Sequence, residues 1–186
     1  MSGMRTLLTV LAFLVLFPAR VLAGTQSLAI TTANDDGQIN EVTYADDCAT
    51  AQLYQQYAEL YLGEYMDGEY ETPFFRYALS QAIPAGATIT SATLTLNARS
   101  NSPPSATENF SITADDVANA AQVNSKLDHP GCPDAAAQTT ATTWTITTWA
   151  AGTHVSPNFA AVLQELVNDN SGLASGAYVQ IWIKLD

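Results

Sequence analysis

The chain has 186 residues, with 18 acidic residues against six basic ones, and its formal net charge is −12. A surface with this excess of negative charge repels nucleic acid and anionic lipid, so we expect neither as a partner. Hydrophobic residues make up 47% of the chain, which is enough for one globular domain with a single core.

The first 23 residues have the features of a secretory signal peptide. Arg5 provides a positive start, residues 7–17 form an apolar run, and small residues surround Ala23. This run is too short to span a bilayer, which takes about 20 residues, and no later stretch is long and apolar enough. We therefore expect cleavage after Ala23 and a secreted, extracellular or cell-surface protein without a membrane span. The mature chain would have 163 residues, 18 of them acidic and four basic.

The chain contains two cysteines, Cys48 and Cys132. In a secreted protein their expected state is a disulfide. A zinc site formed by both cysteines with His129 and His154 is the alternative. Only His129 and Cys132 lie close together in the sequence, whereas zinc ligands usually come in closely spaced pairs. The disulfide is therefore the favoured interpretation.

The mature sequence begins with residues 24–33, GTQSLAITTA, an alternating segment that predicts a strand. Leu28 and Ile30 would share one face of it. The segment NDDGQIN, residues 34–40, follows, and we predict a turn at Asp36–Gly37.

Residues 60–71, LYLGEYMDGEYE, predict a hairpin that turns at Asp67–Gly68. Leu60 and Leu62 would point inward on its first strand. The next segment, PFFRYAL, should place a row of apolar side chains on one side. These are Phe75, Tyr77 and Leu79.

Alternation over residues 92–98, ATLTLNA, predicts another strand after a turn at residues 84–86. Residues 124–140 form a long loop in the sequence pattern, and the chain closes with an alternating strand over residues 177–185. Strand-like runs at residues 109–114 and 142–149 lie between them.

One helix is predicted near residues 157–169, where apolar side chains recur at helical spacing. Ser156 would be its N-cap, Pro157 its first residue, and Gly172 would follow its end. Many short strands and one short helix predict an all-β fold for residues 34–186. We expect an antiparallel β-sandwich of jelly-roll-like type.

Two segments carry a resemblance to a known family. They are FFRYALSQAIPAGATITSATLTLNA, residues 74–98, and TTWTITTWAAGTHVSPNFAAVLQELVNDNSGLASGAYVQIWI, residues 142–183. Their order and content resemble secreted bacterial β-sandwich surface modules, and more loosely the jelly-roll modules called DNRLRE. Such modules often have Trp where this chain has Leu173. The resemblance implies a secreted jelly-roll-like sandwich, but no single activity.

The sequence gives no sign of catalysis. It lacks a GxSxG elbow, and both histidines lie in loop-like segments without a partner motif. With 18 acidic residues, some pair of carboxylates will have glycosidase spacing by chance, so that pattern carries no information. We expect a protein that is not an enzyme.

Calcium is the one metal cofactor that the acidic residues suggest. Asp35, Asp36, Asp46 and Asp47 precede Cys48 in loop-like segments, and carboxylate oxygens are the ligands that Ca²⁺ prefers. The EF-hand spacing is absent, and a solvated acidic face is the favoured alternative.

Exposed aromatic rings are the second kind of candidate site, because they can stack on sugar rings. The candidates are Tyr61, Tyr65, Tyr70, Trp149 and Trp182. Their alternative role is as half-buried residues of the sandwich, which is the more common one for aromatic residues in strands. Asn109 begins an N-glycosylation sequon, Asn-Phe-Ser.

Two functions follow from these observations. The first is an extracellular structural subunit that assembles with copies of itself into a surface fibre or filament. Its N-terminal strand would add to a neighbour's sheet, with Leu28 and Ile30 setting the register. The alternative is a carbohydrate-binding or adhesive module.

Overall fold

The computed structural model describes residues 24–30, 32–41, 48–56, 59–66, 68–98, 107–147 and 149–186. Within these ranges the chain is built mainly from antiparallel strands and has one short α-helix, which confirms the predicted all-β, sandwich-like fold. The predicted signal peptide lies outside the described residues.

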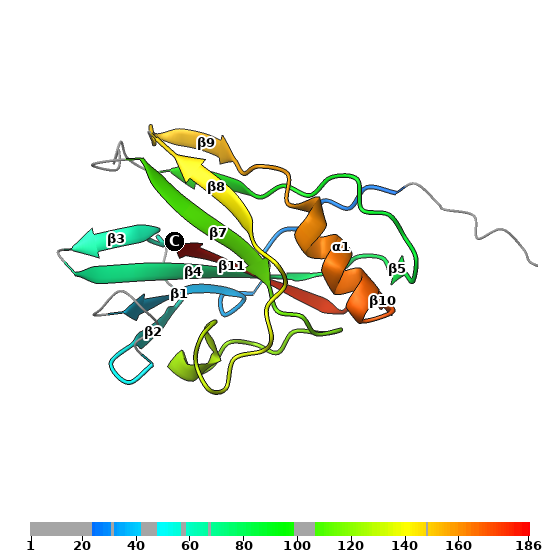
Figure 1. Cartoon of the computed structure of the whole chain (residues 1–186), viewed down its shortest axis with the longest axis horizontal. Coiled ribbons are helices and arrows are strands. Elements are labelled where there is room, and N and C mark those ends of the chain that lie inside the picture. The colour runs from blue at the N-terminus through cyan, green and yellow to red at the C-terminus, as the bar shows by residue number, and fades with distance from the viewer. Residues whose placement is uncertain are drawn as a thin grey trace, which may run out of the picture.

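The elements in chain order are β1 (Asp36–Glu41), β2 (Gln52–Gln55), β3 (Gly63–Met66), β4 (Glu69–Ala78), β5 (Ile83–Pro84), β6 (Thr95–Ala98), β7 (Glu108–Ala114), the 3-10 helix η1 (Lys126–Asp128), β8 (Thr142–Ile146), β9 (Gly152–Val155), α1 (Ala160–Asp169), β10 (Gly172–Leu173) and β11 (Tyr178–Leu185). The main sheet has seven strands in the order β2-β1-β4-β11-β7-β8, with β3 paired to β4. The pairs β6–β9 and β5–β10 lie with α1 on one face of this sheet and form the second layer (Figure 1).

The larger core lies between the main sheet and the second layer. Phe75 of β4, Ile181 of β11 and Phe110 of β7 face this core, and Val162 and Leu166 of α1 pack against them. Successive side chains of a strand point to opposite faces, so every second residue of these strands is buried here. Each such side chain stabilises the fold by roughly 1.5–3 kcal/mol relative to an exposed one.

A smaller core covers the opposite, outer face of the main sheet. Ile39, Phe74 and Trp182 are fully buried there, and the ring centroids of Phe74 and Trp182 are 5.2 Å apart. The Nε1 of Trp182 donates a hydrogen bond to Asp115 Oδ1 at 2.8 Å, and Val123 packs against the same cluster. The segment between β7 and β8 therefore covers the sheet, although the sequence indicates only a long loop.

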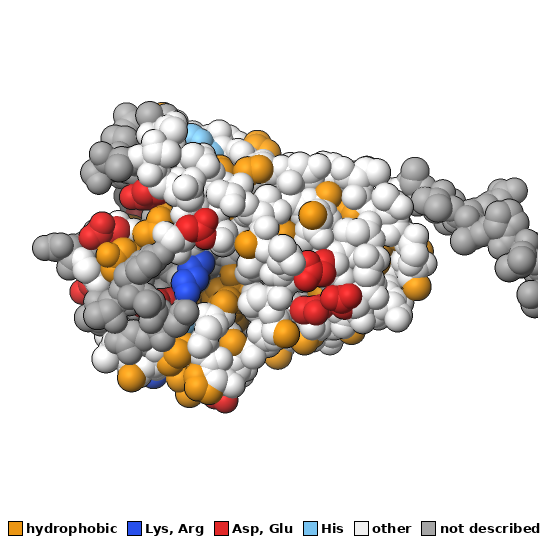
Figure 2. All heavy atoms as spheres, in the orientation of Figure 1, with side chains coloured by type: hydrophobic (Ala, Val, Ile, Leu, Met, Phe, Trp, Pro, Cys, Tyr) orange, Lys and Arg blue, Asp and Glu red, His pale blue; other side chains and the backbone are white. Residues whose placement is uncertain are grey.

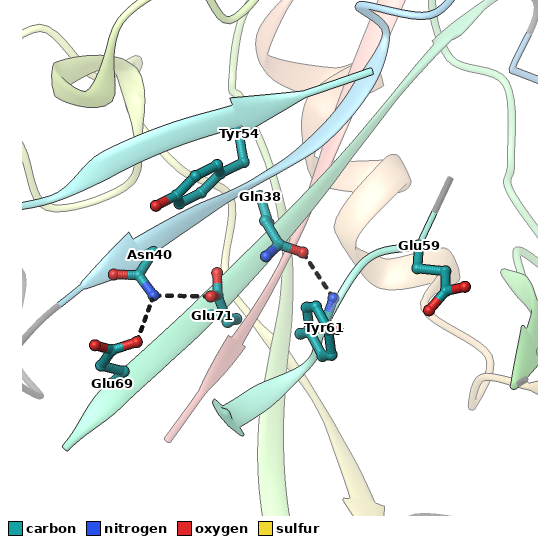
Figure 3. Close-up of a pocket in the computed structure, with 7 residues that line it drawn as sticks. All are labelled: Gln38, Asn40, Tyr54, Glu59, Tyr61, Glu69 and Glu71. Atoms are coloured by element: carbon teal, nitrogen blue, oxygen red, sulfur yellow. Dashed lines mark hydrogen bonds between the residues drawn. The ribbon is translucent and has the colours of Figure 1, made fainter. Parts of the chain in front are cut away.

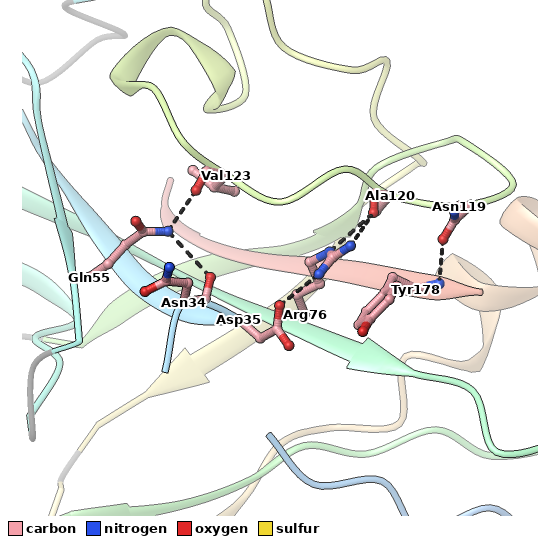
Figure 4. Close-up of polar contacts among 8 residues, drawn as sticks. All are labelled: Asn34, Asp35, Gln55, Arg76, Asn119, Ala120, Val123 and Tyr178. Carbon is pink, nitrogen blue, oxygen red and sulfur yellow. Dashed lines mark hydrogen bonds and ion pairs between the residues drawn. The ribbon is translucent and has the colours of Figure 1, made fainter. Parts of the chain in front are cut away.

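Arg76 fixes this covering segment to the sheet (Figure 4). Its Nη1 lies 2.7 Å from Asp35 Oδ1, and its Nε and Nη2 donate to the carbonyl oxygen of Ala120 at 3.1 and 3.0 Å. The guanidinium carbon lies 3.5 Å from the centre of the Tyr178 ring. One planar side chain thus joins three chain segments, which the smaller ammonium of Lys could not do in the same way.

The predicted disulfide between Cys48 and Cys132 is present, with Cα atoms 5.6 Å apart. It links the residues before β2 to the covering segment. On the chain-entropy view, a cross-link across 84 residues stabilises a fold by roughly 4 kcal/mol. The ammonium of Lys126 adds a second link by donating to the carbonyl oxygen of Ala49.

The predicted turn at Asp36–Gly37 is wrong, because both residues belong to strand β1. A Cβ at Gly37 would lie 2.5 Å from the Phe74 ring and 2.5 Å from the carbonyl oxygen of Tyr54. Glycine is present here because the chain packs too closely for a side chain, and not because the backbone turns. The predicted hairpin forms between β3 and β4, with Gly68 at a φ of 84°. Leu60 and Leu62 pack on the larger core as expected, but they precede β3, which begins at Gly63, and so do not lie on its strand.

The predicted helix start is also wrong. The helix begins at Ala160, and its N-cap is Phe159, which makes no side-chain capping bond. The hydroxyl of Ser156 instead accepts a hydrogen bond from the Leu94 backbone at 2.9 Å, and the Ser156 backbone N–H donates to Leu94 O. This exchange replaces the strand pairing predicted for residues 92–94, so β6 begins only at Thr95. Among the described residues, no helix is long and apolar enough to cross a membrane.

Residues 24–30 do not form the predicted strand. They lie against their own domain, where Leu28 and Ile30 pack on the larger core. The side chain of Gln26 anchors the segment: it donates to Gln81 O and accepts from Ser80 Oγ and Gln81 N, all within 3.1 Å. Side chains, and not a backbone ladder, hold this segment in place.

We expect Gly37→Ala to destabilise the protein, because the added methyl group must displace the Phe74 ring or the β2 backbone. Overpacking of this kind costs about 1–3 kcal/mol. Urea denaturation should show the loss. Gly24→Ala is the control, since no atom lies within 4 Å of that Cβ position. Equal midpoints for both variants would contradict this account of Gly37.

Candidate functional site

A groove opens on the inner face of the main sheet, near the end where β4 begins (Figure 3). It encloses about 190 Å³. Residues from β1, β2, β4 and the segment before β3 line it. They are Gln38, Asn40, Tyr54, Glu59, Tyr61, Glu69 and Glu71.

Strand register explains why these side chains meet. Asn40 of β1 lies opposite Glu71 of β4, and Gln38 of β1 lies opposite Tyr54 of β2. Residues at alternate positions of β4 share a face, so Glu71 and Phe75 face the same side of the sheet. That face is apolar where the second layer covers it and polar toward the start of β4, where the groove opens.

Hydrogen bonds order the floor of the groove (Figure 3). The Asn40 amide donates to Glu71 Oε1 at 2.8 Å and to Glu69 Oε2 at 3.4 Å. The backbone N–H of Tyr61 donates to Gln38 Oε1 at 2.7 Å, which ties the segment before β3 to β1. The amide and carboxylate groups are therefore held in place before any ligand arrives.

Glu71 is 3% exposed, and its Oε2 has no hydrogen-bond partner among the residues that the structure describes. Burial raises the pKa of the Glu71 carboxyl, hydrogen bonds from the Asn40 and Gln38 side chains lower it, and nearby Glu69 and Glu41 raise it. A buried carboxylate oxygen without a donor is costly. Because Oε2 is buried, a ligand hydroxyl or amide that donates to it must first displace the side chains that cover it.

Two tyrosines lie on either side of this floor in Figure 3, with Gln38 and Glu71 between them. Tyr61 is 43% exposed, and Tyr54 is half-buried, with its hydroxyl donating to Gln52 Oε1 at 2.8 Å. An aromatic ring offers a flat apolar surface beside the polar floor. The groove thus combines apolar surface with preorganised acceptors, as small-ligand sites do.

The structure does not bring the predicted aromatic residues together. Tyr61 lies in the groove, whereas Tyr70 projects from the outer face of β4, where it is aligned with Glu41. Trp149 stacks between Trp144 and His154, with centroid distances of 5.4 and 4.5 Å. Strand β3 includes Tyr65, but its side chain lies outside what the structure describes.

Trp182 is fully buried in the smaller core and is not a surface ring. Asn109 is exposed on β7, and its Oδ1 accepts a hydrogen bond from the hydroxyl of Thr145 at 2.7 Å. The asparagine of the sequon is thus at the surface, but this leaves its glycosylation a prediction.

The structure also does not bring the predicted calcium ligands together among the residues that it describes. Asp35 forms the ion pair with Arg76, and Asp36 lies in β1, aligned with Phe75 of β4. Burial raises the pKa of Asp36. Asp46 and Asp47 lie outside the described residues. Among the described residues, Asp35 and Asp36 share no cluster of three potential metal ligands.

Of the four predicted zinc ligands, three lie together and the fourth lies elsewhere in the fold. His154 lies on β9 next to Trp149, whereas Cys48, His129 and Cys132 form a group whose ligand atoms lie within 4.8 Å of one another. His129, predicted as a surface loop residue, is fully buried.

Of the groove residues, sequence reasoning found only Tyr61 and missed Gln38, Asn40, Tyr54, Glu59, Glu69 and Glu71. The sequence places Gln38 and Asn40 in a polar stretch that resembles a turn, and strand register alone brings Glu71 beside them. The one available signal was the alternation of Gln38 and Asn40 around Ile39.

Comparison of the chain with models of protein families, with curated proteins and with solved structures found no match. The resemblance to DNRLRE-type modules stays a prediction.

We expect Glu71→Gln to raise the free energy of unfolding at pH 7 by about 1 kcal/mol, because it removes a buried charge with one unpaired oxygen. The folded-state pKa of Glu71 lies above its ordinary value of 4.5, so the folded protein binds this proton more tightly than the unfolded chain does. The cost of the charge is therefore absent well below pH 4.5 and grows as the pH rises through the folded-state pKa.

Denaturation at pH 7 and pH 3.5 tests this expectation. The gain from Glu71→Gln should disappear at the lower pH. Asp134→Asn, at an exposed position in the covering segment, is the control and should change neither value. A gain of the same size at both pH values would show that the charge of Glu71 is not its cause.

Proposed function

We propose that this protein binds carbohydrate through the groove between Tyr54 and Tyr61. The observation that carries the proposal is the buried Glu71 Oε2, which has no donor among the described residues and lies on the groove floor between two tyrosines. A sugar presents hydroxyl donors around an apolar ring face. The groove offers carboxylate acceptors for the hydroxyls and tyrosine rings for the apolar face.

The size of the groove limits the ligand. Sites for drug-sized molecules enclose roughly 300–1,000 Å³, whereas this groove encloses about 190 Å³. It fits about one sugar ring, so a longer glycan would extend past Tyr61 into solvent. Affinity for a single monosaccharide should therefore be weak.

The negative charge of the groove determines which class of sugar it can bind. Glu59, Glu69 and Glu71 line the groove, and no basic side chain does so among the described lining residues. Figure 2 shows one face of the molecule, where acidic side chains outnumber basic ones and one acidic patch lies over α1. Uronic and sialic acids would be repelled, so the expected ligands are neutral sugars or amino sugars.

We expect Tyr61→Ala to weaken binding by about two- to tenfold, because the lost ring face is worth about 0.5–1.5 kcal/mol. Tyr70→Ala is the matched control: it removes the same side chain from the outer face of β4 and should leave binding unchanged. A glycan array finds the ligand, and titration calorimetry with the best neutral oligosaccharide compares the variants. An array without hits, or equal losses in both variants, would refute the proposal.

Self-assembly into an extracellular structural subunit is the second candidate function. The observation that favours it is the way residues 24–30 attach. Leu28 and Ile30 pack on the larger core while the segment forms no strand. A neighbour's copy of the same segment could occupy that site without the loss of any strand pairing, and a contact of this kind propagates into a filament.

Deletion of residues 24–33 separates the two functions. If the segment links neighbours, the deletion should abolish polymers seen by negative-stain microscopy, with and without Ca²⁺, and leave the far-ultraviolet circular dichroism of the domain unchanged. Binding of glycan should persist, since no groove residue lies in this segment. Dispersed monomers of the intact mature protein at high concentration would rule out the assembly function.

A further inference from the structure

A group of three potential metal ligands, with a fourth beside one of them, lies beneath the covering segment on the outer face of the main sheet. The ligand atoms of Cys48, His129 and Cys132 lie within 4.8 Å of one another. The carboxylate Oε1 of Glu41, from β1, lies 3.6 Å from His129 Nε2. His129 is fully buried, Glu41 is 2% exposed and Cys132 is 7% exposed.

The imidazole of His129 is held with one nitrogen facing this group. Its Nδ1 lies 2.8 Å from the carbonyl oxygen of Pro130, and because a carbonyl only accepts, Nδ1 carries the proton. In the neutral ring the lone pair is then on Nε2. Histidine ligands of metals are commonly oriented in this way, with the second ring nitrogen donating to a backbone carbonyl.

The atoms around Nε2 have no proton to offer it. Cys132 Sγ lies 3.3 Å away and belongs to a disulfide, and Glu41 is an acceptor when ionised. In the reduced chain two thiolates would lie in this buried group beside the Nε2 lone pair and the Glu41 carboxylate, and a divalent cation would offset their negative charge.

We propose that the reduced chain binds a zinc ion through Cys48 Sγ, Cys132 Sγ, His129 Nε2 and a Glu41 carboxylate oxygen. A dithiol reductant supplies two electrons and two protons to the Cys48–Cys132 bond, which becomes two thiols while the reductant closes into a cyclic disulfide. On metal binding each thiol releases its proton to solvent, and the two thiolates bind the ion.

The ligand set suits zinc better than calcium. Two sulfur atoms, one imidazole nitrogen and one carboxylate oxygen make a closed four-coordinate site of the structural kind. Calcium prefers six to eight oxygen ligands, and this site offers too few. Tetrahedral ligands about 2.3 Å from the ion require the sulfur atoms to separate to about 3.8 Å, which side-chain rotation can provide.

The local sequence also fits. His129-Pro130-Gly131-Cys132 is a tight turn, closed by a 3.1 Å hydrogen bond from Cys132 N to His129 O. Gly131 has a φ of 98°, which favours glycine. Paired ligands of structural zinc sites are often separated by two to four residues, and His129 and Cys132 are separated by two. The site shares no residue with the carbohydrate groove, so each proposal is tested without the other.

Cobalt(II) is the probe, because tetrahedral thiolate coordination gives it strong visible absorption and a sulfur-to-metal charge-transfer band. Reduced full-length protein should bind one equivalent of cobalt with these bands, and zinc should displace it. The oxidised protein should show neither. His129→Gln should weaken zinc affinity at least tenfold, while His154→Gln, which alters the chain's other histidine, should leave it unchanged.

Glu41→Gln provides a second variant should His129→Gln fail to fold, and it should weaken zinc affinity by about tenfold or more. Circular dichroism checks the fold of each variant before titration. The proposal is overturned if the reduced wild type shows no tetrahedral cobalt spectrum. It is also overturned if a folded His129→Gln or Glu41→Gln variant binds zinc as tightly as the wild type.

Discussion

The alternation of side chains along β4 determines both cores and the groove. Phe74 faces the outer core and Phe75 the inner one, because neighbouring residues of a strand point to opposite faces. The same rule places Glu71 on the inner face, because it lies four residues before Phe75 on the same strand. The second layer covers that face at Phe75, while at Glu71 it opens into the groove. Glu71 is buried there beside Asn40, whose amide donates to Oε1, while Oε2 has no donor among the described residues.

Strand β1 connects the two candidate sites through the same geometry. Gln38 and Asn40 line the groove on the inner face, whereas Glu41 reaches His129 on the outer face. The disulfide adds a second connection, since Cys48 leads into β2, the strand that carries Tyr54. The groove and the cysteine cluster therefore lie back to back on one pair of strands, although they share no side chain.

A strand could be predicted from the sequence where its side chains alternate clearly between apolar and polar. The alternation of residues 177–185 is clear, and β11 covers almost that range. β1 was missed because it is nearly buried on both faces and its inner face is polar, so Gly37 resembled a turn residue. Residues 92–94 alternate like a strand, yet the Ser156 hydroxyl takes the place of a ladder partner. The groove could not be predicted, because it depends on the register among three strands, which composition and periodicity do not determine.

The pairing of Arg76 with Asp35 inside the fold leaves the net charge of the molecular surface strongly negative. One of only six basic residues in the chain is used inside the fold, where it neutralises Asp35 and stacks on Tyr178. Glu41, Glu71 and Asp115 are buried as well, yet the formal net charge of −12 remains, so copies of the protein repel one another in dilute buffer. At physiological salt the screening length is about 8 Å, and molecules must come within that distance before any short-range attraction acts. Ionic strength therefore sets how closely these molecules can crowd on a surface.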